Sequence, residues 1–203
     1  MGRPAANDQV LPILAEPRLP SVRVVSKPLA TTWRVLDGLP AYGAMATPFS
    51  ATGRGAHSEG LVVEFVGAPR WVGNFQRGIA SLDVVFGSRE HSSVSVIAGG
   101  QGYVVEPESR RCVRTFGGGI EHAFFFGSRV VLSDGFTFEA TDGDRLIWRT
   151  RRVSWDGVIG VRVDGERIVG EAYDPMTDVW RAFSVDVESG DVVGGSEPPD
   201  FSR

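Results

Sequence analysis

The chain has 203 residues, a net charge of −4 and a pI near 5.4. This length fits one domain, or at most two small ones, and the acidic balance argues against a dedicated nucleic-acid binder, which usually carries a basic excess. A single cysteine, Cys112, excludes an internal disulfide, and no segment approaches the roughly eighteen apolar residues of a membrane span. We therefore expect a cytoplasmic protein without membrane contact.

The first sixty residues predict little regular structure. Residues 1–21 hold four prolines and no apolar periodicity, which indicates an irregular N-terminal arm. Residues 22–25 and 31–36 are β-rich, whereas residues 37–60 are rich in Gly, Ala, Ser, Thr and Pro. We expect a long loop there, of a kind that is often functional when ordered. The expected domain spans 22–196, with a C-terminal tail at 197–203.

From Leu61 onward the chain consists of short β-branched and aromatic runs separated by Gly, Asp or Ser turns. Asp134-Gly135 and Asp164-Gly165 predict tight hairpins, because glycine readily adopts positive φ. No segment of helical length shows a 3.6-residue period. We predict an all-β chain of consecutive antiparallel hairpins, with strands near 61–66, 82–86, 94–97, 103–105, 112–116, 123–126, 130–132, 136–138, 146–148, 158–163, 168–169, 180–185 and 192–193.

A hairpin phrase recurs three times, each time as an apolar strand, an acidic residue, a small polar turn and a second strand. Its acidic anchors, Glu106, Glu139 and Asp186, are 33 and then 47 residues apart. Units of about forty residues suit one four-stranded propeller blade. We predict a small β-propeller-like fold of about four to five antiparallel blades, three of them near 93–127, 129–164 and 166–195. A strand from the N-terminal region would complete the third blade and close the ring. An open β-meander or a β-sandwich is the alternative, since spacing does not establish closure.

Two resemblances support repeats of this kind. The phrase from Phe138 to Gly143, followed by Leu146-Ile-Trp148, resembles the blade motif of quinoprotein-type propellers. No counterpart of the quinone-binding residues is present, so the resemblance implies the fold and no cofactor. The phrases beginning at Trp71, at Val153 and at Gly170, together with the run from Trp180 to Ser196, resemble a set of small uncharacterised bacterial all-β proteins. This second resemblance spans about 71–196 and implies no catalytic residue.

Catalytic and metal-binding patterns are weak. The three histidines, His57, His91 and His122, have no Gly-x-Ser-x-Gly elbow or recognisable acidic partner, and Cys112 lies in an apolar strand, as a core residue would. No Cys/His spacing suits zinc. Closely spaced carboxylates could suit calcium, but Asp and Ser are also common turn formers. We expect turns and no metal at these carboxylates, which belong to 142–144, 174–178 and 186–188.

Aromatic residues beside polar groups at strand ends form the main candidate binding set. Such residues suit protein interfaces, although the tryptophans could equally lock neighbouring blades together. The members are Trp71, Asn74, Gln76, Trp155, Asp156, Tyr173, Asp174 and Trp180. A second candidate is an anion patch, because strict strand alternation would place Arg145, Arg149 and Arg151 on one face and Trp148 on the other. The alternative is that these arginines pair with acids across the sheet.

With no catalytic constellation, the sequence favours a non-enzymatic module that docks a protein partner through a propeller face. A bacterial immunity or defence-associated role would suit a compact acidic scaffold. One alternative is a carbohydrate-binding propeller in which Trp155, Tyr173 and Trp180 stack on a sugar. Another is a hydrolase that uses Asp or Glu in a central pocket.

Overall fold

The computed structural model describes residues 23–25, 32–53, 58–67, 69–87, 93–143 and 145–196. Within these residues it contains seventeen β-strands and no helix, which confirms the all-β prediction. The predicted arm at 1–21 and tail at 197–203 lie outside the described residues.

The strands form four sheets, named here sheets I to IV. Sheet I has the order β2-β4-β5-β3, sheet II β1-β6-β7-β8-β9, sheet III β10-β11-β12-β13 and sheet IV β14-β15-β16-β17. The strands of sheet I are β2 (Thr32–Leu36), β3 (Thr47–Phe49), β4 (Leu61–Val66) and β5 (Trp71–Phe75). Those of sheet II are β1 (Arg23–Val25), β6 (Val84–Gly87), β7 (Val94–Ala98), β8 (Gln101–Glu106) and β9 (Arg111–Gly117). Sheet III contains β10 (His122–Phe126), β11 (Arg129–Ser133), β12 (Phe138–Asp142) and β13 (Arg145–Arg149). Sheet IV contains β14 (Val158–Asp164), β15 (Arg167–Asp174), β16 (Val179–Asp186) and β17 (Val192–Gly194).

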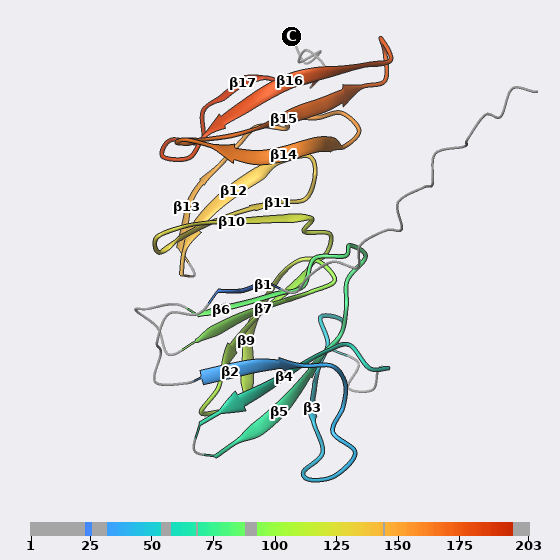
Figure 1. Cartoon of the computed structure of the whole chain (residues 1–203), viewed down its shortest axis with the longest axis vertical. Helices are drawn as coiled ribbons and strands as arrows, with labels where there is room; N and C mark the ends of the chain where they lie inside the picture. Colours follow the sequence, from blue (N-terminus) through green and yellow to red (C-terminus); the bar gives the residue numbers. More distant parts are fainter. Residues whose placement is uncertain are drawn as a thin grey trace, which may run out of the picture.

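The four sheets stack one on another in the order I, II, III and IV (Figure 1). An apolar cluster fills each junction. Phe65 and Tyr103 belong to the cluster between sheets I and II, Ile97 and Leu132 to the one between II and III, and Phe183 to the one between III and IV. Sheets I and IV lie at opposite ends of the stack, so these blade-like units do not close into a ring.

The predicted grouping of strands was displaced by one strand. Sheets II, III and IV begin at β6, β10 and β14, each one strand before the expected blade start. The Phe-rich strand β10 pairs with β11 across a two-residue turn, so it opens sheet III instead of ending sheet II. The expected N-terminal strand exists as β1, but it pairs in parallel with β6 of sheet II. It therefore does not complete sheet IV or close a ring.

The predicted loop at 37–60 is only partly irregular. It contains β3, which adds to β5 in parallel at the edge of sheet I. The Ser50 hydroxyl then donates a hydrogen bond of 2.5 Å to Gln76 Oε1, and the amide of Gly60 donates to Asn74 Oδ1 at 2.8 Å. These bonds attach the two ends of the segment between β3 and β4 to β5 and to the residue that directly follows it.

The recurring hairpin phrase corresponds to the turn between the third and fourth strands of sheets II, III and IV. In sheets II and IV the turn spans four residues and ends in a positive φ, at Arg110 (55°) and Gly190 (78°). In sheet III it spans two residues, since Asp142 pairs directly with Arg145. Asp142, and not the predicted Glu139, is therefore the acidic residue before the turn in that copy.

Candidate functional site

The predicted aromatic and polar set separates into two groups at opposite ends of the stack. Trp71, Asn74 and Gln76 belong to β5 of sheet I or follow it directly. The other members belong to sheet IV and to the loop that leads into it. The structure therefore does not bring the eight residues together into one site.

The sheet I group has structural contacts throughout. Trp71 is 5% exposed, stacks on Phe65 with ring centroids 4.3 Å apart, and donates its indole N–H to the carbonyl of Pro107 at 2.9 Å. Pro107 lies in the third-to-fourth strand turn of sheet II. Trp71 thus locks sheet I to sheet II, as the alternative reading of the tryptophans predicted.

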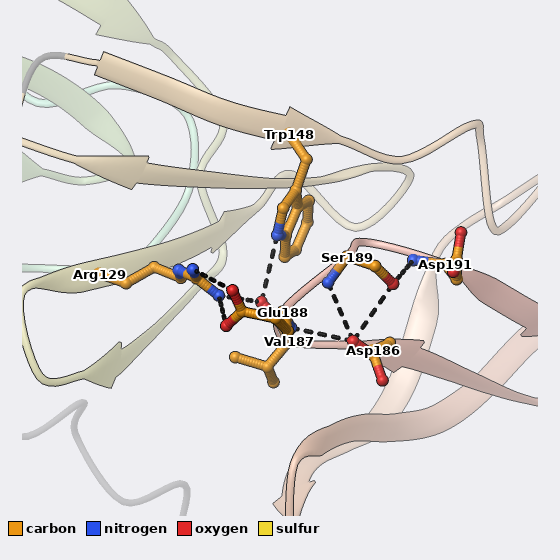
Figure 2. Close-up of polar contacts among 7 residues, drawn as sticks. All are labelled: Arg129, Trp148, Asp186, Val187, Glu188, Ser189 and Asp191. Atoms are coloured by element: carbon orange, nitrogen blue, oxygen red, sulfur yellow. Dashed lines mark hydrogen bonds and ion pairs between the residues drawn. The ribbon is translucent and has the colours of Figure 1, made fainter.

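Trp148 makes the equivalent lock between sheets III and IV. Its indole N–H donates to the carbonyl of Val187 at 3.1 Å (Figure 2). Val187 follows the acidic anchor Asp186, as Pro107 follows Glu106, so the two carbonyls occupy matching positions in their turns. In sheet III the corresponding residue is Gly143, in a two-residue turn.

The Arg129 side chain also binds this turn of sheet IV, through Val187 and Glu188 (Figure 2). Its guanidinium donates to the carbonyl of Val187 at 2.7 Å and to both carboxylate oxygens of Glu188 at 2.7 and 3.1 Å. The hydrogen bond from Arg129 lowers the pKa of the Glu188 carboxyl. Sequence reasoning missed this contact, because fifty-nine positions separate the two residues and only the stacking of the sheets brings them together.

A cleft of about 430 Å³ opens beside this ion pair and bears on the hydrolase alternative. Three carboxylates line it, those of Asp142, Glu166 and Glu188. A hydrolase with two carboxylates needs one of them protonated near neutral pH, with a raised pKa. Glu188 has the opposite shift and is engaged by Arg129, so it is a poor candidate for the acid.

Asp174 organises the turn between β15 and β16. Its carboxylate accepts hydrogen bonds from the Met176 amide at 3.0 Å, from the Thr177 hydroxyl at 2.8 Å and from Arg181 Nε at 2.8 Å. The bonds from Thr177 and Arg181 lower the pKa of the Asp174 carboxyl. Asp186 accepts from the amides of its own turn in the same way. Both carboxylates therefore shape turns, and no group of three or more His, Cys, Asp or Glu among the described residues is arranged to hold a metal ion.

Tyr173 and Trp180 form an aromatic pair at one end of sheet IV. They are direct cross-strand partners with ring centroids 5.1 Å apart and planes tilted by 46°. The Tyr173 hydroxyl donates to Asp178 at 2.6 Å, and this bond raises the pKa of the phenol. Trp180 remains 42% exposed. Nearby, Trp155 is half-buried and its amide donates to the Ser196 hydroxyl, whereas Asp156 is exposed.

This pair belongs to the outward face of sheet IV. Phe183 and Val185 of β16 point inward to the junction with sheet III, so alternation directs Trp180, Ala182 and Ser184 outward. Their cross-strand partners continue the face: Tyr173, Glu171 and Val169 on β15, Ile159 and Arg162 on β14, and Val193 on β17. Ile159 is 45% exposed and Val193 65% exposed. No described segment covers this face, which mixes aromatic, aliphatic and polar side chains.

The other three sheets differ from sheet IV. Sheets II and III have an apolar junction on each face. The outward side of sheet I carries the carboxylate of Glu64, which is only 7% exposed and is paired with Arg34 and Arg70. Val66 on that side is 44% exposed, so among the described residues the outward face of sheet IV differs in exposing an aromatic side chain beside aliphatic ones.

The predicted arginine patch is divided by a β-bulge. Arg149 lies opposite Glu139 and forms an ion pair of 2.5 Å with it, whereas Arg145 lies opposite Asp142. Glu139 and Asp142 are three residues apart on an unbroken strand, so they point to opposite faces. Strict alternation was therefore a wrong assumption, since the bulge puts Arg145 and Arg149 on opposite faces. Arg151 donates to the carbonyl of Gly194 at 2.9 Å, between sheets III and IV.

Cys112 and His122, the remaining candidate nucleophile and base among the described residues, are both half-buried. Burial raises the pKa of the Cys112 thiol, which donates to the carbonyl of Arg114 at 3.3 Å, so the reactive thiolate is disfavoured. Burial lowers the pKa of His122. His57 and His91 lie outside the described residues.

Comparisons with known proteins give no family. No family model and no curated protein matches the chain. Among solved structures, the N-terminal domain of Nup159 aligns at 14% identity and a TM-score of 0.37, over 58% of this chain and 34% of that one. A structure of S. cerevisiae Dbp5 bound to Nup159, Gle1, IP6 and ADP aligns at 15% identity and 0.37, over 60% of this chain and 35% of that one. Hsv2 of Kluyveromyces marxianus aligns at 13% and 0.37, over 66% and 44%.

The chain thus spans between a third and a half of the length of these structures, and likenesses this slight carry no argument about function. The resemblance to a set of bacterial all-β proteins stays a prediction. No helix in the described part of the chain is long and apolar enough to cross a membrane.

Proposed function

We propose that this protein is a non-enzymatic interaction module that binds another protein through the outward face of sheet IV. The observation that carries the proposal is the exposure of Trp180, Ile159 and Val193 on one sheet face. The sheet faces at the three junctions of the stack are instead buried in apolar clusters. A contiguous apolar patch with aromatic residues and a polar surround is typical of protein interfaces.

The chemistry of the face suits a protein partner better than a sugar. The rings of Tyr173 and Trp180 are tilted by 46° to one another, so the pair does not form one continuous flat platform for a sugar ring. Ile159, Val169 and Val193 place apolar side chains on the other three strands of the face, among the polar side chains of Arg162, Glu171 and Ser184. The net charge of −4 favours a basic partner. A toxin, nuclease or defence component of a bacterial cytoplasm is the partner that we propose to look for first.

The test is a capture experiment with matched surface variants. Wild-type protein, Trp180→Ser and a control, Ile79→Ser, are used as baits in a native lysate. Ile79 is 95% exposed and lies in the segment between β5 of sheet I and β6 of sheet II, outside sheet IV. We expect a stoichiometric partner that wild type and Ile79→Ser retain and Trp180→Ser loses. Absence of a stoichiometric partner, or equal capture by Trp180→Ser, would contradict the proposal.

A further inference from the structure

The first strand in chain order of each blade-like unit lies at one side of its sheet. These strands are β2, β6, β10 and β14. Strands β2, β10 and β14 are the edge strands on this side of sheets I, III and IV, whereas in sheet II the edge strand is β1, which lies next to β6 (Figure 1). In sheet II this side has gained a strand, because β1 pairs with β6 in parallel from Arg23 opposite Val84 to Val25 opposite Phe86. The fold therefore accepts an added parallel strand at this position.

Strand β14 of sheet IV carries protection against such addition. Its pairing with β15 is interrupted between Ile159 and Arg162, where Gly160 adopts a φ of +62°. Two charged residues, Arg162 and Asp164, follow the bulge. Bulges and charges are the usual devices by which proteins keep a strand edge from pairing with another chain.

Strand β10 of sheet III has neither device within its five residues; the exposed Glu121, whose amide donates to the carbonyl of Ser133 at 2.8 Å, lies just before it. The pairing of β10 with β11 is unbroken from His122 opposite Ser133 to Phe126 opposite Arg129. Its sequence, His-Ala-Phe-Phe-Phe, has no acidic residue, lysine, arginine, proline or glycine. All five residues are half-buried, and no described strand pairs with the other side of β10.

The backbone groups that face the open side follow from the hairpin geometry. Phe126 and Arg129 flank a two-residue turn in which Gly127 has a φ of +65°. The residues that close such a turn exchange both hydrogen bonds, and bonded pairs then alternate along the strands. Phe126, Phe124 and His122 therefore bond to β11. The N–H and C=O groups of Ala123 and Phe125 point toward the open side.

A side-chain atom at the start of β10 also lacks a partner. Nδ1 of His122 is buried without a hydrogen bond among the described residues, although buried polar atoms in native structures are normally paired. The ring lies parallel to Phe124 at 6.2 Å. Glu121, immediately before the strand, is exposed.

We infer that β10 is a strand-addition site for an extended segment of a partner protein, which would pair in parallel with β10 as β1 pairs with β6. The fitting segment is short and rich in β-branched residues, like Val24-Val25. Backbone bonds to Ala123 and Phe125 would supply the affinity. A basic residue at the start of the segment, at the position that Arg23 holds in β1, would lie near Glu121. This site is separate from the outward face of sheet IV.

The probe is an acetylated and amidated peptide with the sequence of residues 21–26, Ser-Val-Arg-Val-Val-Ser. Binding to the full chain is followed by fluorescence polarisation, and the site is located by amide hydrogen exchange. We expect the peptide to slow exchange at Ala123 and Phe125. Exchange that slows only at 84–86 would mean that the peptide replaces β1 on β6, and would overturn the inference. So would the absence of protection at about millimolar peptide.

A proline variant tests the backbone contact directly. Ala123→Pro removes an N–H that faces the open side and leaves the bonds to β11, a position where edge strands tolerate proline. We expect at least about tenfold weaker peptide binding, the fold-change that corresponds to one lost hydrogen bond. Circular dichroism checks that the variant is folded, and peptides N-methylated at alternate residues give a second test on the wild-type chain. Trp180→Ser should bind the peptide as wild type does, because the two sites are separate. A failure of the sheet IV proposal can therefore be told apart from a failure of the β10 inference. Equal binding by Ala123→Pro, or equal binding of all N-methylated peptides, would refute the inference.

Discussion

Replacing Trp71 by phenylalanine tests whether the junction between sheets I and II depends on the indole lock. The change removes the N–H that reaches the buried carbonyl of Pro107 at 2.9 Å. Leaving a buried acceptor unpaired costs about 1–3 kcal/mol. The smaller ring also leaves a partly filled space against Phe65, which adds about 1 kcal/mol. We expect the free energy of unfolding to fall by roughly 3 kcal/mol.

Urea denaturation followed by far-UV circular dichroism measures this loss, since the signal does not depend on the deleted tryptophan. With a slope of about 2 kcal/mol per M, the midpoint should fall by roughly 1.5 M. Trp180→Phe is the matched control, because Trp180 is 42% exposed and should change the free energy by less than about 0.5 kcal/mol. If the two variants lose the same stability, Trp71 does not lock the sheets.

Three further predictions use the same denaturation assay. Trp148→Phe should cost less than Trp71→Phe, about 1–2 kcal/mol, because Val187 keeps its bond from an arginine; an equal or larger loss would contradict this. Gly190→Ala should destabilise more than Gly165→Ala, since both have positive φ but only at Gly190 would the new Cβ meet Trp148, at 2.7 Å; equal midpoints would refute the contact. Burial alone would raise the pKa of Glu64, but bonds from two arginines outweigh it and lower the pKa below 4.5. The ion pairs therefore stabilise the folded protein fully above that pH, and this stabilisation is lost as pH falls through the folded pKa. Between about pH 5 and 3 the urea midpoint of Glu64→Gln should fall less than that of wild type. Parallel plots of midpoint against pH would contradict this.

Local patterns predicted the strands well. Alternating and continuous apolar runs located β4, β8 and most of the later strands, and the Asp164-Gly165 hairpin was confirmed as a two-residue turn, whereas β5 was missed. These features depend on neighbouring residues, which a sequence displays directly. The assignment of strands to sheets was less accurate, because β10 can be counted with the strand before it or with the strand after it.

Long-range features could not be read from the sequence. The parallel additions of β1 to β6 and of β3 to β5 leave no local signature. The bulge in β13 changes which arginines share a face, and no Gly or Pro marks it. The outward face of sheet IV was anticipated only through Tyr173 and Trp180. Its other apolar members, such as Ile159 and Val193, look like core residues until the end of the stack is known.

The open stack has a consequence for how stability is distributed. Each sheet packs only on its immediate neighbours, so the chain behaves as a linear array in which nearest-neighbour terms add. An inner sheet is held by two junctions, whereas sheet IV is held by one, and local opening begins where contacts are fewest. A protein bound on the outward face of sheet IV would supply the missing neighbour. Binding there would raise the unfolding free energy of a unit held by one junction, so recognition and folding would be thermodynamically coupled at this end of the array.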